Sequence, residues 1–470
     1  MKNKISISGG RMAEYNVLEM SKLEGSRRFD AEYYEKKYEL IETAIKKHDY
    51  TLLGKQVLVF SKGIFDIKAS TYSEAGIPFV RILNLKDLFV DDEDIIFIPE
   101  QVNNMYSKTS LSKHDIILSK TAQPAASIVN FESCNCSQDT IALKLKSSSD
   151  IRPQFLVCFL NTEYGLPLME RLFTGNIQMH LNLVESRNIV VPVFKKKFQN
   201  TICNIIDSAY ESIVNSKEKY NQAKEILLSS LTILDWNSTL SDSYTKCFSK
   251  IQSSSRIDSE HFLPLYDELY EILQRNASYV KTIRSIKVFN SRGSQPKYYD
   301  DGTLKVINSQ HIKEIHLDYE NLSSTKSEYW DIKRESRVIK NDILTYTTGA
   351  NVGRTNVYLE KEKALASNHV NILRIKDEDP IYVGFVLNSL IGRLQTEKFK
   401  AGSAQAELYP AAIDQFIIPF IEKPKQDQIV DLYIQSYQLK KQSKQLIEKA
   451  KRAVEIAIKL DEKAAFDYLG

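Results

Sequence analysis

The stretch Lys195–Leu234 reads KKKFQNTICNIIDSAYESIVNSKEKYNQAKEILLSSLTIL and contains neither proline nor glycine. Apolar or small residues recur along it in mostly alternating steps of four and three, ending with one full heptad, at Ile202, Ile206, Ala209, Ile213, Ser216, Tyr220, Ala223, Leu227 and Leu234. A repeat of this spacing puts its members on one face of a helix that packs against another helix. The stretch therefore predicts a long helix of the coiled-coil type.

A second line of the same kind ends the chain, at Ile429, Leu432, Ser436, Leu439, Ser443, Leu446, Ala450, Ala453, Ala457 and Leu460. Its small alanine and serine members allow another helix to approach closely. Each predicted helix follows an apolar strand that contains a proline, Asn188–Val193 in the first case and Gln415–Phe420 in the second. Two similar bodies, each followed by a long helix, suggest a duplicated unit.

Short motifs confirm this duplication at an offset close to 227 residues. The matching pairs are Arg28–Tyr34 with Arg256–Phe262, Phe79–Asn84 with Leu304–Asn308, His114–Lys120 with Asn341–Tyr346, Leu160-Asn161 with Leu387-Asn388, Gly175-x-x-Gln178-x-x-Leu181 with Gly402-x-x-Gln405-x-x-Leu408, and Pro192 with Pro419. An offset held over so much of the chain indicates a tandem repeat of a whole domain with its helix.

Each copy mixes helices and strands. A short helix is expected at about 30–46 and about 258–275, with Asp30 and Asp258 as N-caps. Runs of β-branched and aromatic residues follow, and then a helix-like stretch at 154–171 or 380–399. Each copy is thus a predominantly β, irregular α/β domain. The expected divisions are an N-terminal segment 1–26, a first domain 27–194, a helix 195–234, a Ser-rich linker 235–255, a second domain 256–422 and a helix 423–470.

Bulk properties limit the possible classes. A chain of 470 residues and 54.0 kDa is too long for one compact core. A net charge of +3 and a pI of about 8.3 permit a DNA partner without arguing for one. The first residues have no apolar signal region, and no apolar window is long enough to cross a bilayer. Five cysteines with a lone Cys134-x-Cys136 pair indicate reduced structural thiols in a cytosolic protein rather than a zinc site.

Catalytic motifs are not found in the sequence. There is no phosphate-binding Gly-x-x-x-x-Gly-Lys-Ser/Thr run and no motif suited to S-adenosylmethionine. The repeat places the glycine-rich Gly349–Gly353 in a β-turn beside Asp342, with a phosphate loop as the alternative. Glu35–Lys37 fits a solvated helix face better than a nuclease site. Local hydrogen bonds or partner contacts suit the scattered histidines better than metal binding, as at His114, His180, His261 and His369. We expect no metal, no cofactor and no catalysis on this chain.

The chain resembles the specificity subunit of type I restriction–modification systems from about residue 27 onward. The residues that carry the resemblance are the Gly-turn strand Gly76–Asn84, the strand and Gly-rich turn Asp342–Arg354, and the helix entry formed by Ile418-Pro419 and Gln428-Ile429. The first copy departs from this pattern, because Ser119–Ala126 lacks the glycines of the second.

The resemblance implies an α+β architecture: two tandem target-recognition domains separated by two long antiparallel coiled-coil-like helices with pseudo-twofold symmetry. It implies a non-catalytic, DNA-reading role in which each domain reads one half of a bipartite, asymmetric target. The helices would set the spacing and dock two methyltransferase subunits, which supply the S-adenosylmethionine chemistry. A motor-nuclease subunit that uses ATP and Mg²⁺ would join for cleavage. The expected location is the cytoplasm of a bacterium or archaeon, at the nucleoid.

Base reading requires side chains with paired donors and acceptors, and phosphates are contacted by Lys, Ser and Thr. The candidates are polar residues on turns at strand ends. In the first copy they are Ser61, Lys62, Arg81, Asn84, Lys120, Thr121, Gln123, Gln178 and His180. In the second they are Arg292, Gln295, Lys297, Asn308, Gln310, Thr347, Asn351, Arg354, Ser403 and Gln405.

Each candidate has a structural alternative. Any one of them could be a solvated turn residue, Asn84 and Asn308 could cap loops, and Gln178 and Gln405 could share a structural hydrogen bond. Two other functions stay open: a protein–protein scaffold of a phage-defence assembly without sequence readout, and a self-sufficient nuclease. The absence of a carboxylate cluster in the sequence speaks against the nuclease.

Overall fold

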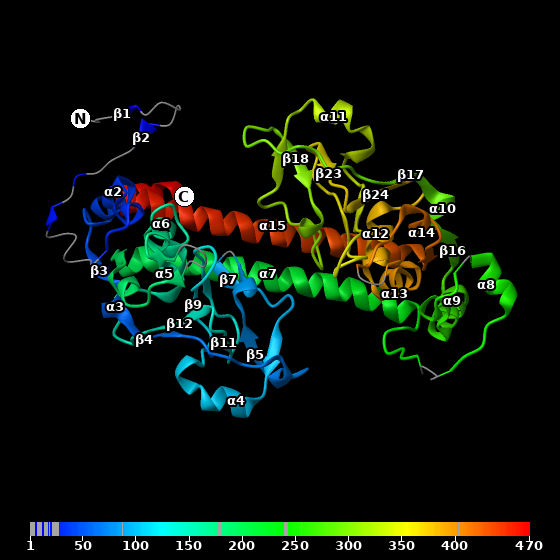
Figure 1. Ribbon diagram of the computed structural model, residues 1–470, viewed down its shortest axis with the longest axis horizontal. Helices are drawn as coiled ribbons and strands as arrows, with labels where there is room; N and C mark the ends of the chain where they lie inside the picture. Colours follow the sequence, from blue (N-terminus) through cyan, green and yellow to red (C-terminus); the bar gives the residue numbers. More distant parts are fainter. Residues whose placement is uncertain are drawn as a thin grey trace. The chain divides into compact units, whose positions relative to one another are not determined.

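A computed structural model describes residues 5–6, 12–13, 17, 19–20, 28–86, 88–175, 180–238, 243–254, 256–402 and 405–470 (Figure 1). The chain divides into two compact units. Unit 1 is Met1–Ser212 together with Lys441–Gly470, and unit 2 is Ile213–Lys440. Both predicted long helices are present, as α7 (Lys196–Ser230) and α15 (Lys423–Lys459), and each contributes one part to each unit.

Most members of the two apolar lines are buried, but the last member of each is not. Leu234 is 46% exposed and Leu460 is 62% exposed, so the prediction that they continue the lines is wrong. Helix α7 ends at Ser230, where Thr232 adopts a φ of +56° and the amide of Ile233 donates to the carbonyl of Leu228. This turn is a Schellman-type cap, and it directs Ile233 rather than Leu234 into the core of unit 2. Leu460 follows the last residue of α15.

In unit 2 the long helices pack antiparallel, as the resemblance implies. In unit 2, Ser216 and Tyr220 of α7 contact Ser436 and Tyr433 of α15, so rising numbers on one helix meet falling numbers on the other. The expectation that small residues permit close approach is confirmed by Ser216 and Ser436, since each hydroxyl reaches the other's backbone carbonyl.

In unit 1 the beginning of α7 meets the end of the chain. The ring of Phe198 contacts that of Phe466 in α16 (Glu462–Leu469), and the backbone amide of Lys195 donates to Glu462. The residue numbers of these two contacts rise together, so they describe the packing of α16, and not of α15, against the start of α7.

Unit 1 carries a six-stranded sheet in the order β4-β12-β9-β10-β7-β6, a second sheet β11-β5-β8 and a pair β15-β3. The bounds are β3 Tyr50–Leu52, β4 Val57–Lys62, β5 Ile77–Val80, β6 Leu85–Lys86, β7 Leu88–Val90, β8 Ile96–Ile98, β9 Ile116–Ser119, β10 Ala126–Ile128, β11 Asn135–Cys136, β12 Thr140–Leu145 and β15 Val190–Pro192. Two further pairs are β1 (Ile5–Ser6) with β2 (Met12–Ala13), and β13 (Phe173–Thr174) with β14 (His180–Leu181).

Unit 2 repeats this plan, with sheets β17-β24-β21-β22 and β19-β18-β23-β20 and a pair β16-β25. The bounds are β16 Tyr279–Thr282, β17 Lys287–Arg292, β18 Leu304–Ile307, β19 Ser323–Thr325, β20 Arg337–Val338, β21 Ile343–Tyr346, β22 Thr355–Val357, β23 Ala364–Ala366, β24 Val370–Ile375 and β25 Ile417–Phe420. The order β17-β24-β21-β22 matches β4-β12-β9-β10, and β23-β18-β19 matches β11-β5-β8. The predicted tandem repeat of a mixed α/β domain is therefore confirmed.

The shorter helices also correspond. In unit 1 they are α2 Lys36–Ile45, α3 Leu53–Gln56, α4 Glu100–Met105, α5 Pro153–Leu160 and α6 Gly165–Glu170; in unit 2 they are α8 Phe248–Ser254, α9 Pro264–Asn276, α10 Ile283–Ile286, α11 Tyr329–Ile332, α12 Pro380–Asn388, α13 Leu390–Phe399 and α14 Pro410–Ile413. The predicted helical stretches 154–171 and 380–399 are each two helices. They are interrupted where Thr162 and Ser389 accept hydrogen bonds from the next helix's first amides.

Asp30 and Asp258 lie at the N-cap positions of 3-10 helices η1 (Ala31–Tyr34) and η6 (Ser259–Phe262), but neither side chain caps its helix. Each carboxylate instead pairs with the arginine two residues earlier, Arg28 or Arg256. These guanidinium groups lower the pKa of both carboxyls through their hydrogen bonds. The expected capping role is wrong, and the Arg-x-Asp pair is the feature that both copies share.

None of the helices in the described part of the chain combines the length and apolar character needed to span a membrane.

A glycine follows the first strand of the central sheet in both copies. A Cβ on Gly63 would lie 2.3 Å from the carbonyl oxygen of Cys136, and one on Gly293 would lie 2.1 Å from that of Ala366. In each copy the strand end thus presses against the second sheet with no space for a methyl group.

We predict that Gly293→Ala destabilises unit 2 by about 2 kcal/mol or more, because backbone must move to admit the methyl group. Lys297→Ala, which truncates an exposed side chain in the same unit, is the control and should change stability by less than about 0.5 kcal/mol. Urea unfolding followed by circular dichroism measures both. Equal midpoints for the two variants would contradict the close packing at Gly293.

Candidate nucleic-acid interface

In unit 1 several predicted residues gather at one end of the central sheet. Lys62 pairs with Ile141 at the end of β4, and Ser119 at the end of β9 pairs with Thr140. The amide of Lys120 donates to Asp139 at 2.9 Å. The ladder therefore brings Ser61 and Lys62 to the same sheet end as the turn that holds Lys120, Thr121 and Gln123.

His180 joins this end through a backbone bridge with Thr121. Its Nδ1 is buried and has no hydrogen-bond partner among the described residues. Gln178 lies outside the described residues. Lys62 and Gln123 are exposed, with the Lys62 ammonium 5.1 Å from the ring centre of the exposed Phe65, whereas Ser61, Lys120, Thr121 and His180 are half-buried.

Arg81 and Asn84 belong to a closed loop. The Oδ1 of Asn84 accepts from the amide of Arg81 at 3.0 Å, and its Nδ2 donates to the carbonyls of Asp91 and Glu93. The Arg81 guanidinium donates to the carbonyl of Asp94 at 2.7 Å. Asn84 is fully buried, so its side chain is a loop cap, which was the structural alternative for this residue.

The expected match of Asn84 with Asn308 is wrong, although both lie in equivalent turns. Asn308 is the N-cap of η7 (Ser309–His311), as Arg81 is of η3 (Ile82–Asn84), and His311 takes the place of Asn84. The backbone amide of Asn308 donates to Nδ1 of His311 at 3.0 Å. The side chain of Asn308 stays partly accessible, and its Oδ1 accepts from the hydroxyl of Tyr298 at 2.8 Å.

Unit 2 has an equivalent sheet end, formed by the end of β17, the residue after β21 and the segment near Leu408. Arg292 donates to the carbonyl of Leu408 at 2.8 Å, and its guanidinium lies 4.6 Å from the ring centre of Tyr409. Thr347 is fully buried, and its hydroxyl has no hydrogen-bond partner among the described residues. The backbone carbonyl of Thr347 accepts from the amide of Leu408 at 2.9 Å, so Thr347 and Arg292 both tie this segment to the sheet end. Gln405 is exposed on the segment next to it.

The remaining candidates of the second copy fall into two sets. Gln295, Lys297 and Gln310 are exposed, on the segments after β17 and β18. Asn351 is half-buried in the turn Gly349–Gly353, which connects the paired strands β21 and β22 as the β-turn prediction required. Ser403 lies outside the described residues.

Arg354 lies just after that turn, and its Nε is 3.5 Å from a carboxylate oxygen of Glu314. Arg393 contacts the same carboxylate at 2.6 Å. Sequence reasoning missed Glu314 and Arg393, because a contact between segments so far apart leaves no local pattern. Asp342, expected beside the turn, lies at the other end of β21 and pairs with Arg374 at 2.7 Å.

No group of three or more His, Cys, Asp or Glu side chains in the described part of the chain is placed to hold a metal ion. Burial raises the pKa of the Cys136 thiol to about 12 and that of Cys203 to about 11, so both are protonated at neutral pH. Cys134 and Cys158 are also buried with raised pKa values.

Comparisons with known proteins give structural similarities only. No protein-family model and no curated protein sequence matches the chain. A type I restriction–modification system S subunit from M. genitalium is 11% identical, over 88% of this chain and 96% of that one, with a TM-score of 0.40. A chain described under complex assembly and conformational transition of the type I R-M system is 13% identical, over 89% and 97%, with a TM-score of 0.28. The HsdS subunit from Thermoanaerobacter tengcongensis is 12% identical, over 88% and 97%, with a TM-score of 0.28.

We predict different stability effects for two candidates of the first copy. Asn84→Ala removes a buried amide that makes three hydrogen bonds and should destabilise unit 1 by about 1–3 kcal/mol. Gln123→Ala, on an exposed turn, should change stability by less than about 0.5 kcal/mol. Thermal unfolding of the purified variants distinguishes them, and an unchanged midpoint for Asn84→Ala would refute its role as a loop cap.

Proposed function

We propose that this chain is the non-catalytic DNA sequence-recognition subunit of a type I restriction–modification complex. The observation that carries the proposal is the repeat itself. One mixed α/β topology occurs twice, each time followed by a long helix, and the two helices pack antiparallel in unit 2. Such an arrangement suits two reading domains and a spacer, and it leaves the chemistry to partner chains.

Equivalent sheet ends with different side chains support a bipartite, asymmetric target. The exposed candidates are Lys62 and Gln123 in unit 1 and Gln295, Lys297, Gln310 and Gln405 in unit 2. Glutamine donates and accepts at once, as adenine edges require, and lysine neutralises phosphates. Because the two sets differ in residue type and position, each domain would select its own half-site.

The long helices fit a spacer. Helices of 35 and 37 residues extend about 50–55 Å at 1.5 Å per residue, which exceeds one DNA turn of about 34–36 Å. Their outward faces would dock two methyltransferase subunits that carry S-adenosylmethionine. A motor-nuclease subunit with ATP and Mg²⁺ would complete the complex for cleavage. In this proposal the chain works in the cytoplasm.

The first test removes exposed side chains from one unit at a time. Lys62→Ala with Gln123→Ala should relax the choice of one half-site, and Gln295→Ala with Lys297→Ala the other, in complexes reconstituted with the methyltransferase. Each lost base contact should weaken binding by about 1–3 kcal/mol, and each lost phosphate contact should lower the salt dependence by about one charge. Adenine-methylation sequencing reads the half-site choice, and fluorescence anisotropy measures affinity and its salt dependence.

Lys459→Ala, which removes an exposed charge on α15, serves as the control for total charge, and the thermal midpoint of each variant serves as the control for folding. If the wild-type complex binds scrambled DNA as tightly as its target, sequence recognition is refuted. Assembly with partners but no discrimination would then favour a protein–protein scaffold in a phage-defence assembly.

A second test changes the spacer. Inserting one heptad into both α7 and α15 keeps the apolar lines in phase and lengthens each helix by about 10 Å. The permitted gap between half-sites should then grow by about three base pairs, at about 3.4 Å per pair. Methylation mapping reads the gap directly, and an unchanged gap would contradict the spacer role.

A further inference from the structure

A polar contact interrupts the apolar seam between α7 and α15 in unit 2. Ser216 donates to the backbone carbonyl of Ser436, and Ser436 donates to that of Ser216, both at 2.7 Å. The two hydroxyl oxygens are 3.1 Å apart, and both residues are buried. Each hydroxyl proton is thereby committed to the opposite helix.

His316, between η7 and β19, reaches this contact from the body of unit 2. Its Nε2 lies 2.8 Å from Oγ of Ser436. Because the Ser436 proton is donated to Ser216, the Nε2–H of His316 must be the donor, and Nδ1 carries the lone pair. Nδ1 is buried without a hydrogen-bond partner in the described part of the chain. The imidazole is enclosed by the rings of Tyr220, Tyr433 and Tyr437.

The first copy lacks this set. At the offset of 227 residues, Phe89 stands for His316, Ala209 for Ser436 and Ser443 for Ser216. Neither Phe89 nor Ala209 can form the hydrogen bonds, and the hydroxyl of Ser443 is buried without a partner among the described residues. Phe89 instead contacts the ring of Tyr210, which is the equivalent of Tyr437.

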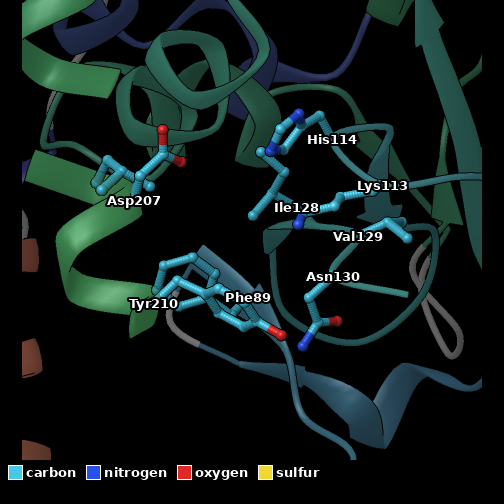
Figure 2. A pocket seen from close by; sticks show the side chains of 9 residues that line it. Phe89, Lys113, His114, Ile128, Val129, Asn130, Asp207 and Tyr210 are labelled. Carbon is cyan, nitrogen blue, oxygen red and sulfur yellow. The ribbon is translucent and has the colours of Figure 1, made fainter. Parts of the chain in front are cut away.

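A small hollow lies at this place in unit 1, between the sheet and α7 (Figure 2). Phe89, Ile128 and Val129 line it from the strands, and Asp207 and Tyr210 line it from the helix. At the equivalent place in unit 2 the ring of His316 contacts the rings of Tyr433 and Tyr437, both on α15. The two bodies are therefore fastened to their helices by different means.

We propose that His316, Ser436 and Ser216 form a positioning set that fixes the register of the two helices in unit 2 and fastens the second recognition domain to them. A slip of one helix along the other would leave two hydroxyls and an imidazole N–H buried without partners, at a cost in free energy. A seam of apolar contacts alone would not impose this cost, because apolar side chains have no fixed partners. The set itself stands on geometry, and only its consequence for DNA reading rests on the proposed function.

A double-mutant cycle on the full chain tests the set. Ser436→Ala leaves the Nε2–H of His316 buried and unpaired, so its thermal midpoint should fall by several degrees. Adding His316→Phe recreates the Phe–Ala pair of the first copy and should recover part of that loss. Ser443→Ala is the matched control in unit 1, and its midpoint should not fall. Additive losses in the double variant would overturn the proposal.

A pH profile separates the set from simple packing. Burial, with a smaller effect of Lys440, holds the pKa of His316 well below its usual range. In the unfolded chain a histidine has a pKa of about 6.5, so it takes up a proton below that pH while the folded, buried His316 stays neutral. The free energy of unfolding is therefore unaffected above about pH 6.5 and decreases as the pH falls below it. His316→Gln keeps a donor for Ser436 but cannot titrate. The difference between the thermal midpoints of the wild type and this variant should therefore shrink as the pH is lowered from 8 to 5. A constant difference would contradict a neutral, donating His316.

DNA reading by the reconstituted complex gives the functional result. Ser436→Ala should reduce the preference for the correct over the altered sequence at least several-fold at the half-site read by unit 2, and leave that preference unchanged at the other half-site. His316→Gln should retain most of the wild-type preference at both half-sites. Equal loss at both half-sites would refute positioning of the second domain. If the wild-type complex shows no sequence preference, the proposed function fails, and the unfolding cycle still decides whether the set exists.

Discussion

Two long helices that bury a shared stripe impose the main constraint on this protein. Their backbones come close at Ser216 and Ser436, where each hydroxyl reaches the carbonyl of the other helix, and the buried alanines Ala209 and Ala450 continue the stripe. Each helix also provides a wall of the core in both units, so the body of each domain has to pack against a surface that continues into the other unit. The stripe therefore restricts what can vary in either domain.

Sequence reasoning predicted the duplication and the mixed α/β class from periodicity and from motifs repeated at a fixed offset, whereas the antiparallel helices were implied by the family resemblance. It failed where the backbone leaves its regular path. The left-handed turn at Thr232 moves Leu234 out of the seam, and side-chain caps at Thr162 and Ser389 divide what reads as one helix. Periodicity records the preferred face of a residue but not the point at which a helix stops.

The sequence predicted where the candidate interface lies better than it predicted which side chains are accessible there. Turns at strand ends do gather at one end of the central sheet in each unit. Which side chains remain accessible depends on contacts between distant segments, such as Asn84 with the loop at Asp91 or Arg354 with Glu314. Residue types that suit DNA reading also suit loop capping, and only the three-dimensional partners separate these uses. Asn84 and Arg292 are mostly engaged within the protein, whereas Lys62 and Gln123 are exposed.

The division of the chain has a consequence for synthesis on the ribosome. Unit 1 is completed by Lys441–Gly470, which is translated only after the whole of unit 2. Nascent unit 1 thus waits without its packing against the late segment, including the contact of Phe198 with Phe466, while more than two hundred further residues emerge. Unit 2 needs nothing translated after Lys440, so it can close first, and the exposed face of the nascent chain is a natural target for chaperones until the last helix arrives.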